Sequence, residues 1–136
     1  MAKSIKDPIS VIERHPIRDL IMVDENGFPS ERAMFTAKID DDFTVYFGTF
    51  PAANKCRHIA SNPGVMAVWP TGSGYISLRG NAVILDDKKS REHTWHGAFY
   101  QYFKGGSSDP DFIVVKIKPV SLAYYEEGFM EAEIII

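Results

Sequence analysis

Residues 47–69 read FGTFPAANKCRHIASNPGVMAVW, and this stretch decides the fold. An apolar strand ends at Thr49, a helix carries Lys55 in its first turns, the pair Asn62-Pro63 stops that helix, and a second apolar strand follows. The amides and the positive dipole end of a helix N-terminus favour an anion. The hydroxyl of Thr49 and the cation of Lys55 suit the same ligand. The stretch indicates a phosphate-binding turn, and the alternative is a solvated helix start with a surface lysine.

Short apolar segments separated by turn residues continue on both sides of this stretch. The expected strands span residues 17–24, 28–39, 43–48, 65–69, 75–85, 112–118 and 120–125. The expected helices span residues 4–14, part of 51–62, and 88–103, the last with an apolar face of Trp95, Phe99 and Tyr102. Gly80 predicts either a bulge in its strand or a tight bend of the barrel. Short turns imply antiparallel pairing, so the fold class is mainly β: a six- to seven-stranded barrel with flanking helices, in one domain over residues 1–136.

The composition excludes several classes of function. The chain has 136 residues, 45% of them hydrophobic and 24% charged, and a formal net charge of −3, so a basic surface for nucleic acid is not expected. Cys56 is the single cysteine, which rules out an intramolecular disulfide. The first residues lack a signal-peptide pattern, and no run approaches the roughly 20 apolar residues of a membrane span. We expect a cytoplasmic protein that binds neither nucleic acid nor membrane.

Three further groups of residues are candidates for a site. Arg32 lies on a strand between apolar residues and needs water, a carboxylate or a phosphate as partner. Trp69 and Tyr75 flank a flexible turn, where they can stack on a planar ligand or pack one end of a barrel. His93 and His96 share one face of the expected helix, but no acidic residue or cysteine stands at a familiar ligand spacing, so we expect no metal site.

Four segments, taken in order, resemble the FMN-binding split barrel of the pyridoxamine 5′-phosphate oxidase-like superfamily, and especially its short general stress protein branch. They are LIMVDENGFPSERAMF at 20–35, the stretch 47–69, YISLRGNAVILDD at 75–87 and DPDFIVVKIKPVSLAYY at 109–125. The resemblance implies FMN as the cofactor and a homodimer with the flavin at the subunit interface.

The same resemblance assigns the flavin contacts. It implies that Arg32, Thr49 and Lys55 hold the flavin phosphate and that backbone around Met34 fixes the ring. Asn54 stands where the family commonly has a second basic residue, and Tyr75 aligns with a glutamine near the flavin ring. The expected cofactor-binding residues are therefore Arg32, Ala33, Met34, Phe35, Thr36, Gly48, Thr49, Asn54, Lys55, Trp69 and Tyr75.

The function expected from the resemblance is that of an FMN-binding flavoprotein acting as a small oxidoreductase on a small-molecule substrate. The oxidase's C-terminal Arg-Trp segment is missing, so we do not expect pyridoxamine 5′-phosphate oxidase activity. The alternatives are a non-catalytic flavin-binding or flavin-sensing module, or a barrel that binds deazaflavin or haem. The tail 131–136, EAEIII, is left open as a docking segment or an added strand of a dimer sheet.

Overall fold

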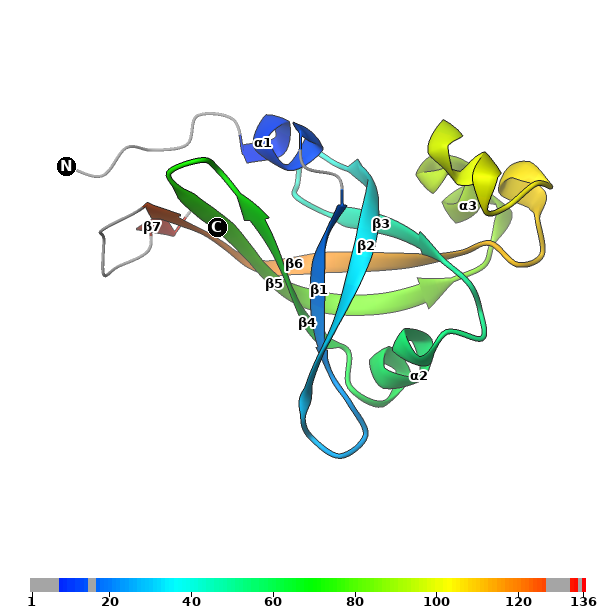
Figure 1. Cartoon of the computed structure of the whole chain (residues 1–136), viewed down its shortest axis with the longest axis horizontal. Helices are drawn as coiled ribbons and strands as arrows, with labels where there is room; N and C mark the ends of the chain where they lie inside the picture. Colours follow the sequence, from blue (N-terminus) through cyan, green and yellow to red (C-terminus); the bar gives the residue numbers. More distant parts are fainter. Residues whose placement is uncertain (1–7, 15–16, 127–132, 135) are drawn as a thin grey trace.

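Strands form most of the chain in the computed structural model, which describes residues 8–14, 17–126, 133–134 and 136 (Figure 1). The strands are β1 (Ile17–Val23), β2 (Pro29–Ile39), β3 (Val45–Thr49), β4 (Gly64–Pro70), β5 (Gly74–Leu85), β6 (Ile113–Glu126) and β7 (Glu133–Ile134). The helices are α1 (Pro8–Arg14), α2 (Asn54–Ser61) and α3 (Lys88–Thr94), with 3-10 turns η1 (Gly97–Gln101) and η2 (Gly106–Ser108). No described helix is long and apolar enough to cross a membrane.

The strands close into a barrel. The sheet order is β3-β2-β1-β4-β5-β6-β7, and a further pairing of β3 with β6 joins the two sides, so that six antiparallel strands form a closed ring. The hairpin between β1 and β2 turns at Gly27, whose φ of 84° is readily adopted by glycine. The expected mainly β barrel with flanking helices is confirmed.

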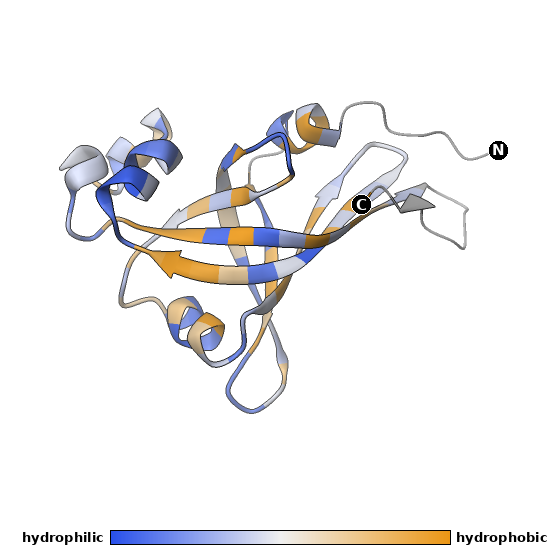
Figure 2. Ribbon diagram, turned by 180° about the vertical axis from the view of Figure 1, so that it is seen from behind, coloured by the Kyte–Doolittle hydropathy of each residue, from blue (hydrophilic) through white to orange (hydrophobic). Residues whose placement is uncertain are grey.

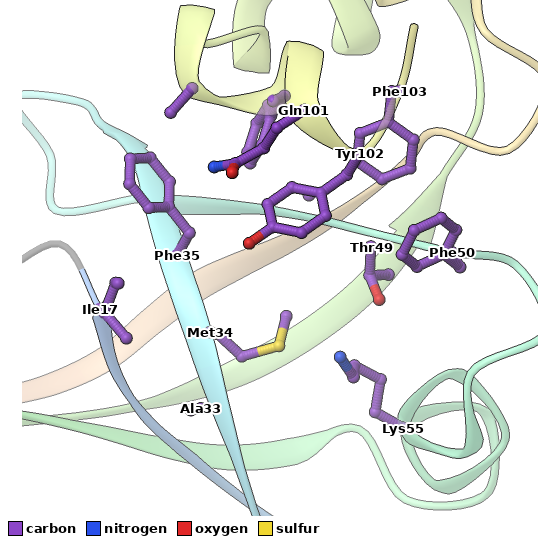
Figure 3. Close-up of a pocket in the computed structure, with 13 residues that line it drawn as sticks. Ile17, Ala33, Met34, Phe35, Thr49, Phe50, Lys55, Gln101, Tyr102 and Phe103 are labelled. Atoms are coloured by element: carbon purple, nitrogen blue, oxygen red, sulfur yellow. The ribbon is translucent and has the colours of Figure 1, made fainter.

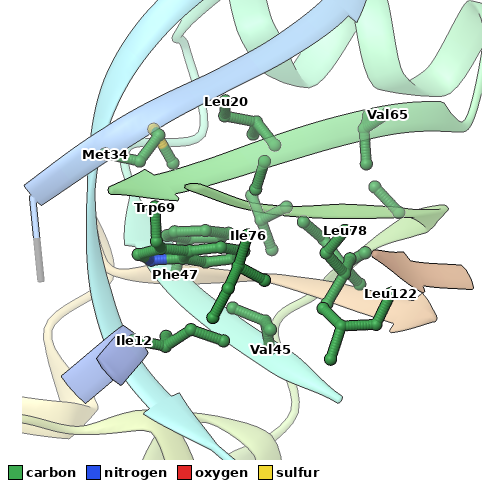
Figure 4. Close-up of a cluster of buried hydrophobic side chains, with 14 of the residues drawn as sticks. Ile12, Leu20, Met34, Val45, Phe47, Val65, Trp69, Ile76, Leu78 and Leu122 are labelled. Atoms are coloured by element: carbon green, nitrogen blue, oxygen red, sulfur yellow. The ribbon is translucent and has the colours of Figure 1, made fainter. Parts of the chain in front are cut away.

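The barrel interior is the main hydrophobic core. Trp69, Phe47 and Leu20 are fully or almost fully buried there, and Ile12 of α1 reaches the same cluster from one end (Figure 4). Alternate residues on β1 and β5 face inward, and Figure 2 shows hydrophobic and hydrophilic residues along β5 and β6. In the view of Figure 1, α1 lies above the strands, and α2 lies below β5 and β6 beside the β1–β2 hairpin.

Two expected strands at the C-terminal end prove to be one. Residues 112–118 and 120–125 were expected as separate strands divided by Pro119, but β6 runs unbroken from Ile113 to Glu126. Pro119 pairs with Gly80 where the register of β5 and β6 shifts, and the unpaired residue there is Val120. The bulge therefore lies in β6, opposite Gly80, and not in the strand of Gly80 itself. Proline is tolerated at a bulge because no ladder hydrogen bond is needed from its nitrogen.

The helix expected over residues 88–103 is wrong in its second half. α3 ends at Thr94, because Trp95 takes extended backbone angles (φ −55°, ψ 134°) and His96 starts the separate turn η1. Trp95 and Phe99 still pack together, in a second cluster with Phe112, whereas the Tyr102 side chain is 62% exposed. His93 and His96 therefore do not share a helix face.

The two ends of the chain are described only in part. Within the expected helix 4–14, residues 8–14 form α1, and residues 4–7 lie outside the described residues. Within the tail 131–136, β7 pairs with β6 of the same chain through the register Ala123 to Ile134. The remaining residues of the tail, apart from Ile136, lie outside the described part.

Candidate functional site

A cavity of about 330 Å³ opens between β2, the end of β3, the start of α2 and η1 (Figure 3). β2 supplies its middle residues, β3 and the following turn supply Gly48 to Phe50, and α2 supplies Lys55. We call residues 97–103, which cover the other side, the roof. The lining residues are Ile17, Ala33, Met34, Phe35, Gly48, Thr49, Phe50, Lys55, Ala98, Phe99, Gln101, Tyr102 and Phe103.

Thr49 and Lys55 form the polar end of this cavity. The Thr49 side chain is 3% exposed, and its Oγ1 has no hydrogen-bond partner. Figure 3 shows the Thr49 hydroxyl and the Lys55 amine on the same side of the cavity. Burial lowers the pKa of Lys55, and the nearby positive charge of Arg32 lowers it further, partly opposed by Cys56. A buried hydroxyl without a partner beside a partly desolvated cation is an arrangement that an anion would complete.

The start of α2 offers further donors at the same end. Its N-cap is Ala53, and no side chain caps the first turn. The Cys56 amide donates to the Ala53 carbonyl at 3.1 Å, which leaves the amides of Asn54 and Lys55 as donors for another acceptor. Ile59 is buried against the barrel, and Arg57 forms an ion pair with Glu25 of the β1–β2 turn. These two contacts fix the helix, and with it Lys55, relative to the barrel.

Aromatic rings line the rest of the cavity. Phe35 lies on the side away from Lys55, edge-on to Phe99 with 5.5 Å between ring centroids, and Phe50 lies beside Thr49 and packs on Phe103 at 4.7 Å (Figure 3). Gly48 is needed because a Cβ built there would lie 2.8 Å from atoms of Phe99 and Phe112. The roof adds Gln101 and Tyr102, whose polar atoms face the cavity in Figure 3. A planar apolar ligand with an anionic group at one end matches this lining.

The structure brings six of the eleven expected site residues to one cavity. Ala33, Met34, Phe35, Gly48, Thr49 and Lys55 line it. Arg32 is not a lining residue; its Nη1 donates to the carbonyl of Glu31 (2.6 Å) and the hydroxyl of Ser30 (3.3 Å). Its charge nevertheless acts on Lys55.

The other four expected residues lie elsewhere. Thr36 faces the barrel and is 8% exposed, and Asn54 begins α2 without lining the cavity. Trp69 is 0% exposed in the barrel core, so the suggestion that its ring stacks on a ligand is corrected. Tyr75 lies on the outer face of β5 and stacks on Tyr125, with 4.5 Å between ring centroids.

Sequence reasoning missed the roof. Ala98, Phe99, Gln101, Tyr102 and Phe103 all line the cavity. Phe99 and Tyr102 were noted in the sequence, but only as part of the apolar face of a continuous helix over residues 88–103. The one local signal near the break after Thr94 was Gly97, an unfavourable residue inside a helix and the first residue of η1.

The histidines of the expected helix have separate partners. His93 Nε2 lies 3.0 Å from Asp40 Oδ1, and the Tyr46 hydroxyl donates to Asp40 Oδ2 at 2.7 Å. Burial, together with the hydrogen bond and the negative charge of Asp40, raises the pKa of Tyr46. His96 instead accepts a hydrogen bond from the Ala98 amide. Within the described residues, no group of three or more His, Cys, Asp or Glu side chains is placed to hold a metal ion.

Comparison with known proteins gives one family and several similar folds. The family model described as pyridoxamine 5′-phosphate oxidase like matches residues 5–135. A protein from Clostridium acetobutylicum related to general stress protein 26 of Bacillus subtilis has a TM-score of 0.82 and 22% identity, over 93% of this chain and 90% of that chain. No curated protein sequence matches the chain.

Two other similar structures carry different ligands in their names. An F420 reductase has a TM-score of 0.62 and 21% identity, over 89% of this chain and 98% of that chain. A heme binding protein from Mycobacterium smegmatis has a TM-score of 0.73 and 12% identity, over 98% of this chain and 60% of that chain. At these identities the likeness establishes the split-barrel fold alone.

Proposed function

The chain belongs to the pyridoxamine 5′-phosphate oxidase-like family, and from this membership and the cavity we propose that it is an FMN-binding flavoprotein acting as a small oxidoreductase. The observation that carries the proposal is the Thr49 hydroxyl, which is buried and unpartnered at the wall of the cavity that also holds Lys55. Buried hydroxyls without a partner are costly, so a ligand oxygen is the partner that this position requires.

The residues of the cavity divide the work of holding FMN. Thr49, Lys55 and the first amides of α2 would hold the phosphate, and the charge of Arg32 would add to the attraction. Met34 and Phe35 would pack against the ring, which the roof shields from water on the other side. Bound FMN would supply the electron and hydride transfer, while the protein supplies binding and orientation.

The same lining favours a flavin over haem. The described residues that line the cavity include no histidine or cysteine, two common ligands of haem iron, although Met34 and Tyr102 are of types that also ligate it. A deazaflavin shares the planar ring and the phosphate, so the cavity does not separate it from FMN. The ligand test below therefore includes it as a competitor.

We also propose that the active form is a homodimer joined through the outer face of β1, β4 and β5. Paired residues share a face of the sheet, and the register Ile21–Met66–Arg79 and Asp19–Val68–Ser77 places these residues outside the barrel. This face is largely apolar, and two hollows of about 370 and 420 Å³ lie on it. Ile17 and Ala33 belong to the same outer face and to the cavity rim, so a second copy seated here would close the cavity.

The deciding experiment is ligand uptake by the purified chain. Protein incubated with FMN, with F420 or with haem, and then freed of excess ligand, should retain FMN and show flavin absorbance. A chain with the circular dichroism of a folded β protein that retains none of the flavin would refute the proposal. Reduction of the bound flavin by NADH or NADPH in stopped flow would then distinguish an enzyme from a non-catalytic flavin module.

A further inference from the structure

His96 connects the roof of the cavity to the barrel. It is the N-cap of η1, and its Nδ1 accepts a hydrogen bond from the Ala98 amide at 3.0 Å. Its ring lies edge-on to Phe35 of β2, with 4.9 Å between ring centroids. Ala98 and Phe35 both line the cavity. The side chain therefore sits between the start of the roof and the strand opposite it.

The cap fixes the protonation state of this histidine. A ring nitrogen that accepts a hydrogen bond from a backbone N–H carries no proton, so the neutral ring has its proton on Nε2. Protonation places a second donor on Nδ1, facing the Ala98 amide, and the cap is lost. An N-cap hydrogen bond is among the main local contributions to the start of a helical turn.

We propose that His96 is a positioning residue for the ligand cavity, holding the roof in place only while its imidazole is neutral. The inference rests on the proposed function, because it takes FMN as the ligand under the roof. With a proton on both ring nitrogens, His96 no longer accepts from the Ala98 amide, the start of the roof loses its cap, and the ligand is held less tightly.

Other titratable groups nearby do not imitate this effect. The titratable and charged groups around His96 come from β2, the following turn, β3, α3 and residues 100–104. They are Glu31, Arg32, Lys38, Asp40, Tyr46, Lys88, Lys89, Arg91, Glu92, His93, Tyr100, Tyr102 and Lys104. Among the described residues, none of these forms a hydrogen bond or an ion pair with the His96 ring. Protonation of His93 acts in the opposite direction, since it would strengthen the contact of α3 with the Asp40 carboxylate.

The test compares the wild type with His96→Asn, because asparagine is a good N-cap that does not titrate in this range. Asparagine keeps the cap but lacks the ring that contacts Phe35, so each dissociation constant for FMN is divided by the same protein's value at pH 8. From pH 8 to pH 5.5 this normalised constant should rise about three- to tenfold more for the wild type than for His96→Asn, the range expected for loss of a cap. The FMN phosphate also titrates in this pH range. Its effect is the same for both proteins, so it cancels in the ratio of their dissociation constants. His93→Asn serves as the matched control and should keep the wild-type pH dependence.

Two ligand-free measurements test the inference separately from the proposed function. Nitrogen NMR of the wild-type ring at pH 8 should show Nδ1 unprotonated, and the opposite tautomer would overturn the inference. Hydrogen exchange of residues 97–103, relative to His96→Asn, should accelerate between pH 8 and pH 5.5. Failure to bind FMN at any pH would refute the proposed function and leave these two results to decide on His96. A constant ratio of dissociation constants, with or without faster exchange, would refute control of binding by the roof.

Discussion

Gly80 of β5 lies directly opposite Pro119 of β6, at the point where the register of the two strands shifts and Val120 is left out of the pairing. The two residues together allow the bulge to form. The proline has no amide to donate, and the glycine has no side chain to collide with the bulged strand. A Cβ on Gly80 would strike the carbonyl oxygen of Lys118 and lie 2.7 Å from Ile117 Cγ2.

Gly80→Ala should therefore lower the free energy of unfolding by about 1–3 kcal/mol, the usual cost of overpacking against backbone that cannot move. Urea unfolding followed by circular dichroism measures it. Gly64→Ala is the matched control on β4, because a Cβ there would meet only Asn62 Oδ1, at an ordinary 3.5 Å. Equal losses for the two variants would show that the bulge does not require glycine.

Thr49→Val should separate stability from binding. Valine has nearly the same shape as threonine and removes a buried hydroxyl that has no partner. The ligand-free chain should keep or gain stability, by up to about 1 kcal/mol, while FMN binding weakens by about 1 kcal/mol. Urea unfolding and fluorescence titration with FMN give the two values. Unchanged FMN affinity would place the phosphate away from Thr49.

Lys55→Met should also raise the stability of the ligand-free chain while it weakens FMN binding, and the gain in stability should depend on pH. Burial lowers the pKa of Lys55 in the folded chain, so the charged amine opposes folding at neutral pH. Because the amine is only half-buried, the ligand-free variant should be more stable at pH 7 by no more than about 0.5 kcal/mol. This gain should shrink as the pH rises toward about 10.4, where the amine also becomes neutral in the unfolded chain.

FMN affinity provides the second half of this prediction. Lys55→Met should weaken FMN binding by about 1.5–3 kcal/mol, the range for a hydrogen bond to a charged group. Riboflavin, which lacks the phosphate, is the control ligand and should lose much less affinity. Equal losses for FMN and riboflavin would remove Lys55 from the phosphate end of the cavity.

Local sequence predicts the barrel because strand and turn residues act over short distances. Asn26-Gly27 and Asn62-Pro63 each impose a backbone geometry that neighbouring residues alone determine. The phosphate end of the cavity could be predicted from the sequence for the same reason, since Thr49 and Lys55 are six residues apart across one strand-to-helix turn.

The roof could not be predicted from the sequence, because its position depends on tertiary packing. Trp95 leaves the helix to pack against Phe112, and the two rings lie 5.2 Å apart although they come from different segments. Helical periodicity in residues 88–103 fits either arrangement, so the pattern alone does not locate the break. Trp69 illustrates the converse error: an aromatic beside a glycine-rich turn suggested a ligand, whereas the barrel buries it completely.

Tyr46→Phe should change the alkaline stability of the protein. Burial and Asp40 raise the pKa of Tyr46 in the folded chain. Above about pH 10 the tyrosine therefore ionises in the unfolded chain before it does so in the folded chain, and the free energy of unfolding of the wild type decreases. At pH 8 the variant should be less stable by about 1–2 kcal/mol, because it lacks the hydrogen bond to Asp40. The difference from wild type should narrow as the pH rises from 10 to 11 in urea unfolding. A difference that stays constant over this range would mean that Tyr46 ionises equally in both states.

The proposed dimer predicts a specific contact between two exposed charged residues. On the outer face Asp19 of β1 and Arg79 of β5 lie on either side of β4, one register step apart, within an apolar surface. Consider a twofold axis that lies in the plane of contact, crosses β4 between Val68 and Met66, and is perpendicular to the line from Asp19 to Arg79. This axis places Asp19 of each subunit over Arg79 of the other subunit, so the pair occurs twice in the dimer. Asp19→Lys and Arg79→Glu should each weaken self-association at least about tenfold, because each places like charges together in a desolvated contact.

Combining the two substitutions is the test that separates this pairing from a general loss of charge. Asp19→Lys with Arg79→Glu restores opposite charges at both contacts, so the double variant should recover most of the wild-type dimer in sedimentation equilibrium. FMN affinity should follow the dimer, falling in each single variant and returning in the double, because a second copy closes the cavity rim at Ile17 and Ala33. A monomeric wild type, or single variants that dimerise like wild type, would move the subunit contact away from this face. A double variant that stays monomeric would retain the face as the contact but reject the Asp19–Arg79 pairing.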